Sequence, residues 1–350
     1  MFKIVNSILL YYYFNVLALI VYPYIVIKSI LSKNSTVFFE RTAEYLILVF
    51  PLIMLFGILC LKYNFMFSAY LLLFYFGGYL FYIFFRQNNI EIDLKNVLIL
   101  LCFLTIAESL AINTIILPSD LPNWPLNAED TILYGHTSRG GYQFSSFYYI
   151  RPTGFGGNPS ITSTLLISIL VYLHNAKEDN LFINLVTFGS IILTYSGVGY
   201  MFLGIYFLFY FRALIISVFI LLTVLIVAEF LSIQKLELSY YQFLIVDILQ
   251  NVMWVVSNIN IYEFVFGQVI PFESPIGGDF YWLYFFQWFG AIGILFYFLL
   301  ISTNASRINF FPILILVIST IHYHTIFSIP GQMIFGYLLT RNNFTTSKNY

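Results

Sequence analysis

The sequence predicts an all-α fold, a polytopic integral membrane protein with about 10–12 transmembrane helices and two large outer loops. Three observations predict it. Of the 350 residues, 60% are hydrophobic and only 9% are charged, whereas soluble domains carry about 25% charged residues. The mean hydropathy is +0.87. The apolar residues also fall into repeated runs of about 20, the length that crosses a bilayer as a helix.

Polar links separate the apolar runs, because charged residues, Gly and Pro are costly or disruptive inside a membrane helix. The predicted spans cover residues 4–30, 43–61, 65–85, 96–117, 159–174, 181–195, 200–211, 213–231 and 280–302, followed by two short spans between Arg307 and Leu339. Pro23 predicts a kink in the first span, which we interpret as retained because no convincing cleavage site follows it. We expect the last stretch to be interrupted at His322–His324 and at Pro330-Gly331.

Lysine and arginine in the short links predict the orientation, because cytoplasmic links carry an excess of both. With the N-terminus outside, one side holds Lys28, Lys33, Arg41, Arg86, Lys95, Lys177, Arg212, Arg307 and Arg341. Lys3 and Lys62 argue weakly for the reverse. The two large loops, residues 118–158 and 232–279, then face outward, and the C-terminus faces the cytoplasm. We treat residues 1–350 as a single membrane domain without the internal repeat that builds many transporters.

The composition also limits the chemistry. A net charge of −1 and the lack of a basic stripe predict no nucleic-acid partner. Cys60 and Cys102 both lie inside apolar runs, so the sequence offers neither a disulfide framework nor metal-ligand spacing. It contains no phosphate-binding P-loop and no Gly-x-Ser-x-Gly elbow. Substrates that arrive already activated therefore fit better than nucleotide hydrolysis on this chain, and no cofactor is expected.

Two segments allow more than one interpretation. Leu244–Val256 is apolar and lies inside the second large loop. It forms either a helix on the membrane surface or a segment that dips back into the protein. In the first case these polar residues would face water: Asp247, Gln250, Asn251 and Asn258. The other segment, Tyr195–Gly199, marks either a close approach of two helices or a simple turn.

The end of the first large loop is the strongest candidate site. It reads Arg151-Pro152-Thr153-Gly154-Phe155-Gly156-Gly157-Asn158-Pro159. A guanidinium binds phosphate or pyrophosphate oxygens in a bidentate fork and stays charged in a low-dielectric site. Gly154, Gly156 and Gly157 would let the backbone approach such a ligand closely. Asn158 is expected to cap the next helix, whose N-terminus favours anions. The alternative is an interfacial arginine that reaches lipid headgroups.

Further candidates for anion binding or proton transfer are Arg139, His136, Glu108, Glu273, Asp279, His322 and His324. His136 is of the residue type that titrates near neutral pH. Glu108 lies within a predicted span, where a carboxylate indicates either a function or a buried ion pair. His322 and His324 would lie about 200° apart on a regular helix and could not face one ligand from it. Packed or interfacial histidines are the alternative. Glu273 and Asp279 would either pair with the arginines or act as a base.

The layout and several local motifs resemble the bacterial O-antigen polymerases, the Wzy-type oligosaccharide repeat-unit polymerases. The layout consists of the many spans, the two outer loops, few charges, and 29 tyrosines and 40 phenylalanines. The motifs are the Arg151–Pro159 segment, Leu193–Gly197, Phe266–Asp279, Tyr281–Tyr284 and Phe289–Gly293. The resemblance covers most of the chain as a layout, and its motifs are degenerate.

The resemblance implies a glycosyltransferase of lipopolysaccharide biosynthesis in the bacterial inner membrane. It would join oligosaccharide repeat units linked to undecaprenyl pyrophosphate on the periplasmic face. Other implied partners are the lipid bilayer, a chain-length regulator and other glycan-assembly membrane proteins. Arginines of the outer loops would hold the carrier pyrophosphate, a role that falls to Arg151 and Arg139. The second loop carries Lys235 but no arginine, so His322 or His324 would serve in place of the expected partner.

Three other functions remain open from the sequence. A flippase for the same lipid-linked glycan would need a hydrated central cavity, and such transporters are usually built from two related halves. An O-antigen ligase or an acyltransferase of the same envelope pathway would share the donor chemistry. A multispan scaffold protein would need no site at all.

Overall fold

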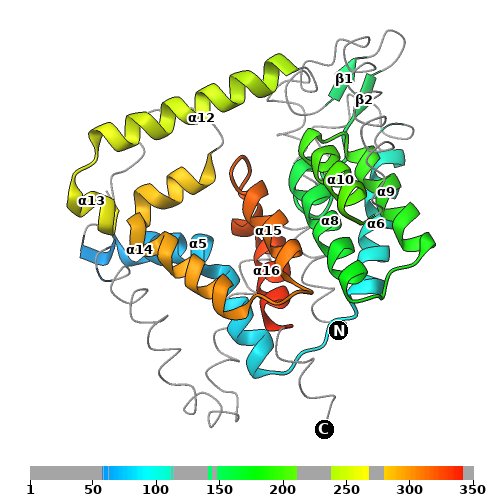
Figure 1. Cartoon of the computed structure of the whole chain (residues 1–350), viewed down its shortest axis with the longest axis horizontal. Coiled ribbons are helices and arrows are strands. Elements are labelled where there is room, and N and C mark those ends of the chain that lie inside the picture. Colours follow the sequence, from blue (N-terminus) through cyan, green and yellow to red (C-terminus); the bar gives the residue numbers. More distant parts are fainter. Residues whose placement is uncertain are drawn as a thin grey trace. The chain divides into compact units, whose positions relative to one another are not determined.

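The computed structural model describes residues 57, 59–61, 63–111, 113, 141–143, 148–210, 238–267 and 280–341. Its helices and strands are labelled in Figure 1. The described residues are predominantly helical, which confirms the predicted class. They belong to two compact units: Met1–Ala18 with Ile92–Ile245 form unit 1, and Leu19–Glu91 with Val246–Tyr350 form unit 2.

Unit 1 is built around one buried helix. Its elements are α6 (Leu94–Leu110), β1 (Gly141–Gln143), β2 (Tyr148–Ile150), α8 (Pro159–Asn175), α9 (Leu181–Thr194) and α10 (Gly197–Tyr210). Helix α8 is buried from its first residue to Leu173 and packs against α6, α9 and α10. Asn158 caps it as predicted, because the side chain accepts a hydrogen bond from the Ser160 N–H. Helix α9 ends at Tyr195, which takes the left-handed conformation with φ 49°.

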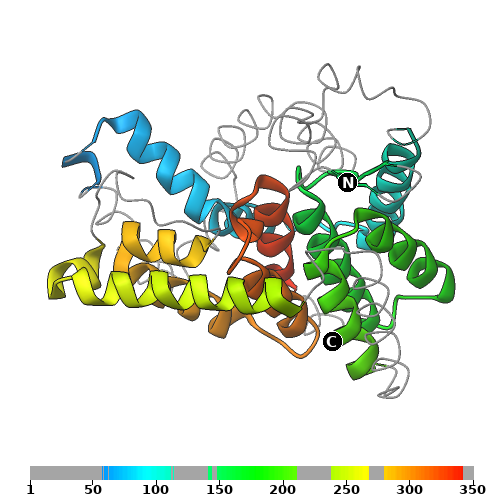
Figure 2. The same cartoon turned by 90° about the horizontal axis from the view of Figure 1, so that it is seen from above.

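Unit 2 contains the longest described helices. Its elements are α5 (Phe65–Gln87), the larger part of α12 (Leu238–Asn258), α13 (Ile261–Phe266), α14 (Tyr281–Asn304), α15 (Phe310–Ser319), η5 (Thr325–Phe327) and α16 (Ile329–Thr340). Figure 2 shows α12 leading into α13. By length and composition, α5 and α14 are each able to cross a membrane, and α9, α10 and α15 are shorter apolar helices.

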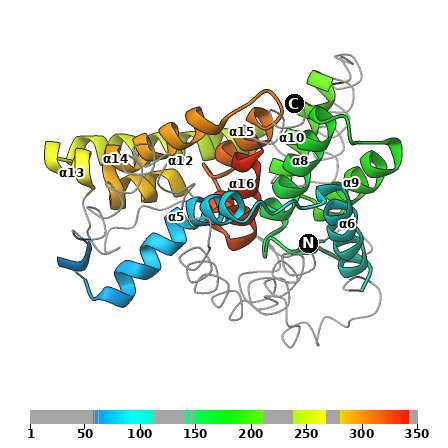
Figure 3. The same cartoon turned by 90° about the horizontal axis from the view of Figure 1, so that it is seen from below.

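Helices α5 and α16 pack side by side at a point where α5 has two glycines (Figure 3). A Cβ on Gly77 would lie 2.6 Å from Cδ of Gln332. The Gln332 amide is fully buried, and its Nε2 donates to the carbonyls of Leu73, Phe74 and Phe327 over 3.1, 2.7 and 3.0 Å. A buried amide with these partners joins α16 to α5 through hydrogen bonds to carbonyls that have no water to bond.

The second half of α14 runs in the same direction as α5 and α16. Tyr82 donates to Asn304 over 2.8 Å, and the Asn309 side chain donates to the Leu338 carbonyl over 2.9 Å, so the three C-terminal ends lie together. The basic residues near these ends are Arg86, Arg307 and Arg341. Unit 2 therefore gathers on one end the arginines that the orientation rule assigned to one side of the membrane.

Helix α14 is bent sharply at Gly290 beside α13 (Figure 1). Gly290 has φ 60° and ψ −160°, which only glycine adopts readily. Gly267, which ends α13 with φ 86°, lies against it. A Cβ on Gly290 would be 2.5 Å from the Gly267 nitrogen and from the Val265 carbonyl oxygen. Gly267 and Gly290 thus allow the backbones of α13 and α14 to pack in direct contact at the bend of α14.

Several expectations need correction or lie outside the described residues. Pro330-Gly331 was expected to interrupt a span, but Pro330 lies in the first turn of α16, where proline fits. The first large loop contains the antiparallel pair β1–β2, an exception to the all-α prediction. In the second loop, Leu244–Val256 is helical, within the longer α12. The spans predicted at 4–30 and 213–231, and most of 43–61, lie outside the described residues.

We expect Gly290→Ala to destabilise the protein by about 3 kcal/mol, because alanine would be strained at this φ and ψ and would collide with the α13 backbone. Thermal unfolding in detergent would measure the change. Gly204→Ala is the matched control, since Gly204 lies within α10 with nothing within 4 Å of its Cβ position. Equal melting temperatures for the two variants would show that the bend is not fixed by Gly290.

Candidate functional site

The Arg151 loop, residues 151–158, connects β2 to the buried helix α8. Arg151 is only 6% exposed, and Phe155 only 1%. Gly154 and Gly157 take positive φ angles of 65° and 69°, and the Gly157 N–H donates to the Gly154 carbonyl over 3.1 Å. The loop is therefore a compact turn packed into unit 1, and it is not a solvated connection.

Glu108 near the end of α6 holds this loop in place. Its Oε1 accepts from the Thr153 N–H over 3.0 Å and from the Thr153 hydroxyl over 2.9 Å. Its Oε2 accepts from the Gly154 N–H over 2.9 Å. Since Glu108 is 5% exposed, these charge-assisted bonds offset the cost of burying its carboxylate. These contacts favour a structural role for Glu108 over a role in the chemistry.

Thr162 holds the loop from the other side. Its hydroxyl donates to the Thr153 carbonyl over 2.6 Å and accepts from the Gly156 N–H over 3.0 Å. A Cβ on Gly154 would lie 2.5 Å from the Thr162 Oγ1, and a Cβ on Gly156 would lie 2.7 Å from the Thr162 nitrogen. The close approach that these glycines allow is thus an approach to α8.

The N-terminal half of α8 carries a row of buried hydroxyls. They belong to Ser160, Thr162, Ser163, Thr164 and Ser168. Ser196 donates to the Ser160 hydroxyl over 3.0 Å, and the Gly199 N–H donates to Ser196 over 3.2 Å. A Cβ on Gly199 would be 2.7 Å from that of Ser163. Both interpretations of Tyr195–Gly199 are therefore confirmed, since Tyr195 and Ser196 form the turn between α9 and α10 and Gly199 approaches α8 closely.

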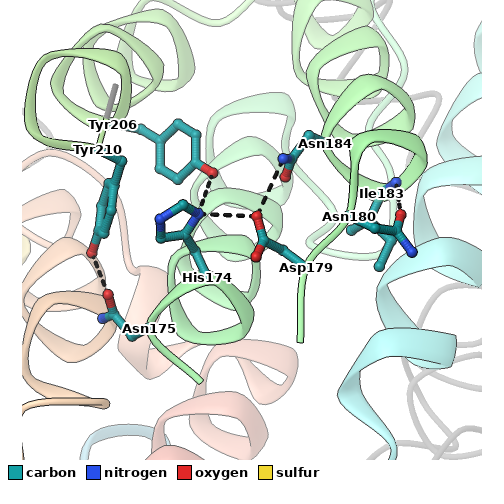
Figure 4. A network of polar contacts seen from close by, with 8 residues as sticks. All are labelled: His174, Asn175, Asp179, Asn180, Ile183, Asn184, Tyr206 and Tyr210. Carbon is teal, nitrogen blue, oxygen red and sulfur yellow. Dashed lines mark hydrogen bonds and ion pairs between the residues drawn. The ribbon is translucent and has the colours of Figure 1, made fainter. Parts of the chain in front are cut away.

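The opposite end of α8 holds a second polar cluster, drawn in Figure 4. His174 Nδ1 lies 3.0 Å from Asp179 Oδ2 and 3.2 Å from the Tyr206 hydroxyl. The Asn184 amide donates to the same Asp179 oxygen over 3.2 Å, and Tyr210 donates to Asn175 over 2.7 Å. One oxygen of Asp179 thus contacts both His174 and Asn184. The cluster ties the end of α8 to α9 and α10.

Unit 1 therefore has two chemically different ends. A helix of the length of α8 spans about 24 Å, with the Arg151 loop before it and His174 at its end. Lys95 lies in the first turn of α6, which runs antiparallel to α8, and Lys177 follows α8. These lysines lie at the end away from Arg151. The orientation predicted from the sequence requires this separation of the lysines from the Arg151 loop.

The predicted histidines lie in the non-helical turn between α15 and η5. The ring of His322 contacts that of Tyr323 at 4.2 Å, and the ring of His324 contacts that of Tyr281 at 5.1 Å. Both imidazoles are partly exposed. They belong to unit 2, whereas Arg151, Glu108 and the loop glycines belong to unit 1. The other predicted residues, Arg139, His136, Glu273 and Asp279, lie outside the described residues.

Sequence reasoning missed Thr153 and Thr162, which anchor the loop, and the pair of His174 with Asp179. One signal was present, since residues 160–168 hold five hydroxyl side chains within an apolar run. Hydroxyls so dense in a membrane helix indicate bonds to neighbouring segments. The pair of His174 and Asp179 gives no comparable signal, because a charged link after a span is ordinary.

We expect Glu108→Gln to destabilise unit 1 by about 2 kcal/mol, because an amide offers one acceptor oxygen where the carboxylate offers two. Its NH2 group would then face a donor of Thr153 or Gly154. The melting temperature in detergent and protease cleavage within residues 151–158 would measure the loss. Glu178→Gln, at an exposed residue, is the control. Equal stability of the two variants would remove the anchoring role.

Neither a protein-family model nor a curated protein matches this sequence, and no solved structure matches the chain.

Proposed function

We propose that the chain is a multi-pass inner-membrane glycosyltransferase that polymerises oligosaccharide repeat units carried on undecaprenyl pyrophosphate at the periplasmic face. The observation that carries the proposal is Arg151, a guanidinium 6% exposed in a glycine loop next to the N-terminus of a buried helix. A guanidinium stays charged even in such low-dielectric surroundings. Diphosphate is a partner that suits the fork of an arginine.

The residues suit a direct transfer. An acceptor hydroxyl would attack the anomeric carbon of the donor glycan, the bond from that carbon to the diphosphate oxygen would break, and the acceptor proton would pass to a base. Arg151 would stabilise the charge that grows on the departing diphosphate. Glu108 is a poor candidate for the base, because both of its oxygens already accept from the loop. Glu273, Asp279 and the histidines remain the candidates.

The positions of basic residues support the proposed orientation within each unit. In unit 1, Lys95 and Lys177 lie at the end away from the Arg151 loop. In unit 2, Arg86 lies in the last turn of α5 and Arg341 directly follows α16, where Arg341 Nη1 is 4.0 Å from a Glu91 carboxylate oxygen. Cytoplasmic placement of these ends leaves the Arg151 loop on the outside, where lipid-linked repeat units would be joined.

We expect Arg151→Ala to abolish chain elongation while the protein stays in the membrane, so that glycan one repeat unit long remains. Arg151→Lys keeps the charge but not the fork, and we expect it to reduce elongation about tenfold. Gel electrophoresis of the surface glycan measures both variants. Arg307→Ala is the control, since Arg307 is exposed at the basic end of unit 2 and should leave chain length unchanged. Wild-type polymer from a stably expressed Arg151→Ala protein would contradict the proposal.

Deletion of the chain separates the rival functions. A polymerase deletion leaves single capped repeat units at the surface and carrier-linked single units on the outer face. Carrier-linked units accumulating on the inner face would indicate a flippase. Loss of all surface polymer would indicate a ligase, and an unchanged glycan would leave a scaffold protein.

A further inference from the structure

A continuous row of rings crosses three elements of unit 2. We call it the aromatic row, and it consists of Tyr70, Phe74, His324, Tyr281 and Tyr284. Successive ring centroids lie 6.1, 6.4, 5.1 and 5.9 Å apart. Tyr70 is 54% exposed, and the other members are partly exposed. Successive rings are thus in contact and partly accessible, and Tyr284 also packs against the cluster of Val255 and Leu283.

The turn that carries His324 is non-helical, and a non-helical backbone is restricted at the depth of a membrane core. Helices α15 and α16 have 10 and 12 residues, so they are about 15 and 18 Å long, well short of the roughly 30 Å of a hydrocarbon core. The turn that joins them, with His324, reaches Phe74 in the middle part of α5. Non-helical backbone at membrane depth is tolerated only inside protein or beside water. A partly exposed imidazole in this turn, that of His324, suits contact with water better than contact with lipid.

The row combines ring faces with polar groups. The row carries three phenol hydroxyls, those of Tyr70, Tyr281 and Tyr284. The His324 imidazole lies in the middle of the row and offers both a donor and an acceptor. A sugar ring has faces rich in C–H groups, which suit the negative face of an aromatic ring, and a rim of hydroxyls, which need donors and acceptors.

An interfacial belt is the other use of tyrosine in a membrane protein. Belt residues lie singly on the lipid-facing surface, each with its polar tip toward the headgroups. Here the rings touch one another across α5, α14 and the turn before η5. They also lie on the side of unit 2 away from Arg86 and Arg341, since His324 precedes α16 and Arg341 follows it. A connected row with an imidazole in it fits a glycan better than a headgroup layer.

We propose that the aromatic row binds the sugar rings of a glycan, which in the proposed reaction is the acceptor repeat unit. The identity of the glycan rests on the proposed function, whereas the binding of sugar rests on the row itself. Stacking on Tyr281 and Tyr70 would orient the chain, and the phenols and His324 would contact its hydroxyls.

The test is saturation-transfer NMR on the full-length protein in lipid nanodiscs. The probe is a one-repeat oligosaccharide released by mild acid from the surface polysaccharide of the source cell, and the protein's aromatic protons are irradiated. We expect signal transfer to the sugar protons with the wild type and with Tyr281→Phe, which keeps the ring. Tyr281→Ala should weaken binding about tenfold. Tyr262→Ala, at a 76% exposed tyrosine of α13 outside the row, should bind like the wild type.

The outcomes separate this inference from the proposed function. The melting temperature shows whether Tyr281→Ala folds. Tyr70→Ala, at the most exposed member of the row, is the second variant, used if Tyr281→Ala does not fold. Arg151→Ala should lose polymerisation and keep sugar binding. Absence of transfer to the wild type, or undiminished binding by the folded alanine variants, would overturn the inference and leave the row as a lipid anchor. If the protein binds sugar but its deletion does not shorten the glycan, the proposed polymerase function is refuted and the sugar-binding inference stands.

Discussion

The buried Glu108 carboxylate is the interaction on which the candidate site depends. It accepts from both donors of Thr153 and from the Gly154 N–H, and so joins the end of α6 to a loop 45 residues further along the chain. A buried anion is costly without such donors, and this loop would have its N–H groups unsatisfied without the anion. The loop donors therefore offset the cost of burying the Glu108 carboxylate, and the carboxylate satisfies the N–H groups of the loop. Arg151 is held at the entrance to α8 because the residues directly after it are fixed in this way.

The two units satisfy their buried polar groups with different residue types. In unit 1, a buried helix carries its own hydroxyls, and Ser160, Thr162 and Ser196 bond to neighbouring segments. In unit 2, one amide, that of Gln332, serves three carbonyls, and the bend of α14 is accommodated by Gly290 and Gly267. Hydroxyls and glycines both allow close backbone approach, which is how helices associate where apolar contact gives no advantage over lipid.

Local signals in the sequence were enough for some helix boundaries, but not for the start of α16 or for the contacts between helices. The start of α8 was predictable because Asn158 and Pro159 are strong N-terminal residues, and α5 fell within about two residues of its predicted run. The bend at Gly290 was not predictable, since a glycine inside an apolar run is equally compatible with a straight helix. Glu108 was recognised as unusual, but its partners were not, because a contact across 45 residues leaves no periodic pattern in the sequence.

The Gln332 amide has a consequence for how the chain is assembled. Its acceptors on α5, the carbonyls of Leu73 and Phe74, come 259 and 258 residues earlier. During synthesis the glycine face of α5 must therefore stay open until the chain has been extended through Gln332. Helix α16 closes that face, so unit 2 is completed only after α16 has been made. A chain that ends before Gln332 would contain α5 but would lack the amide that bonds to the α5 carbonyls.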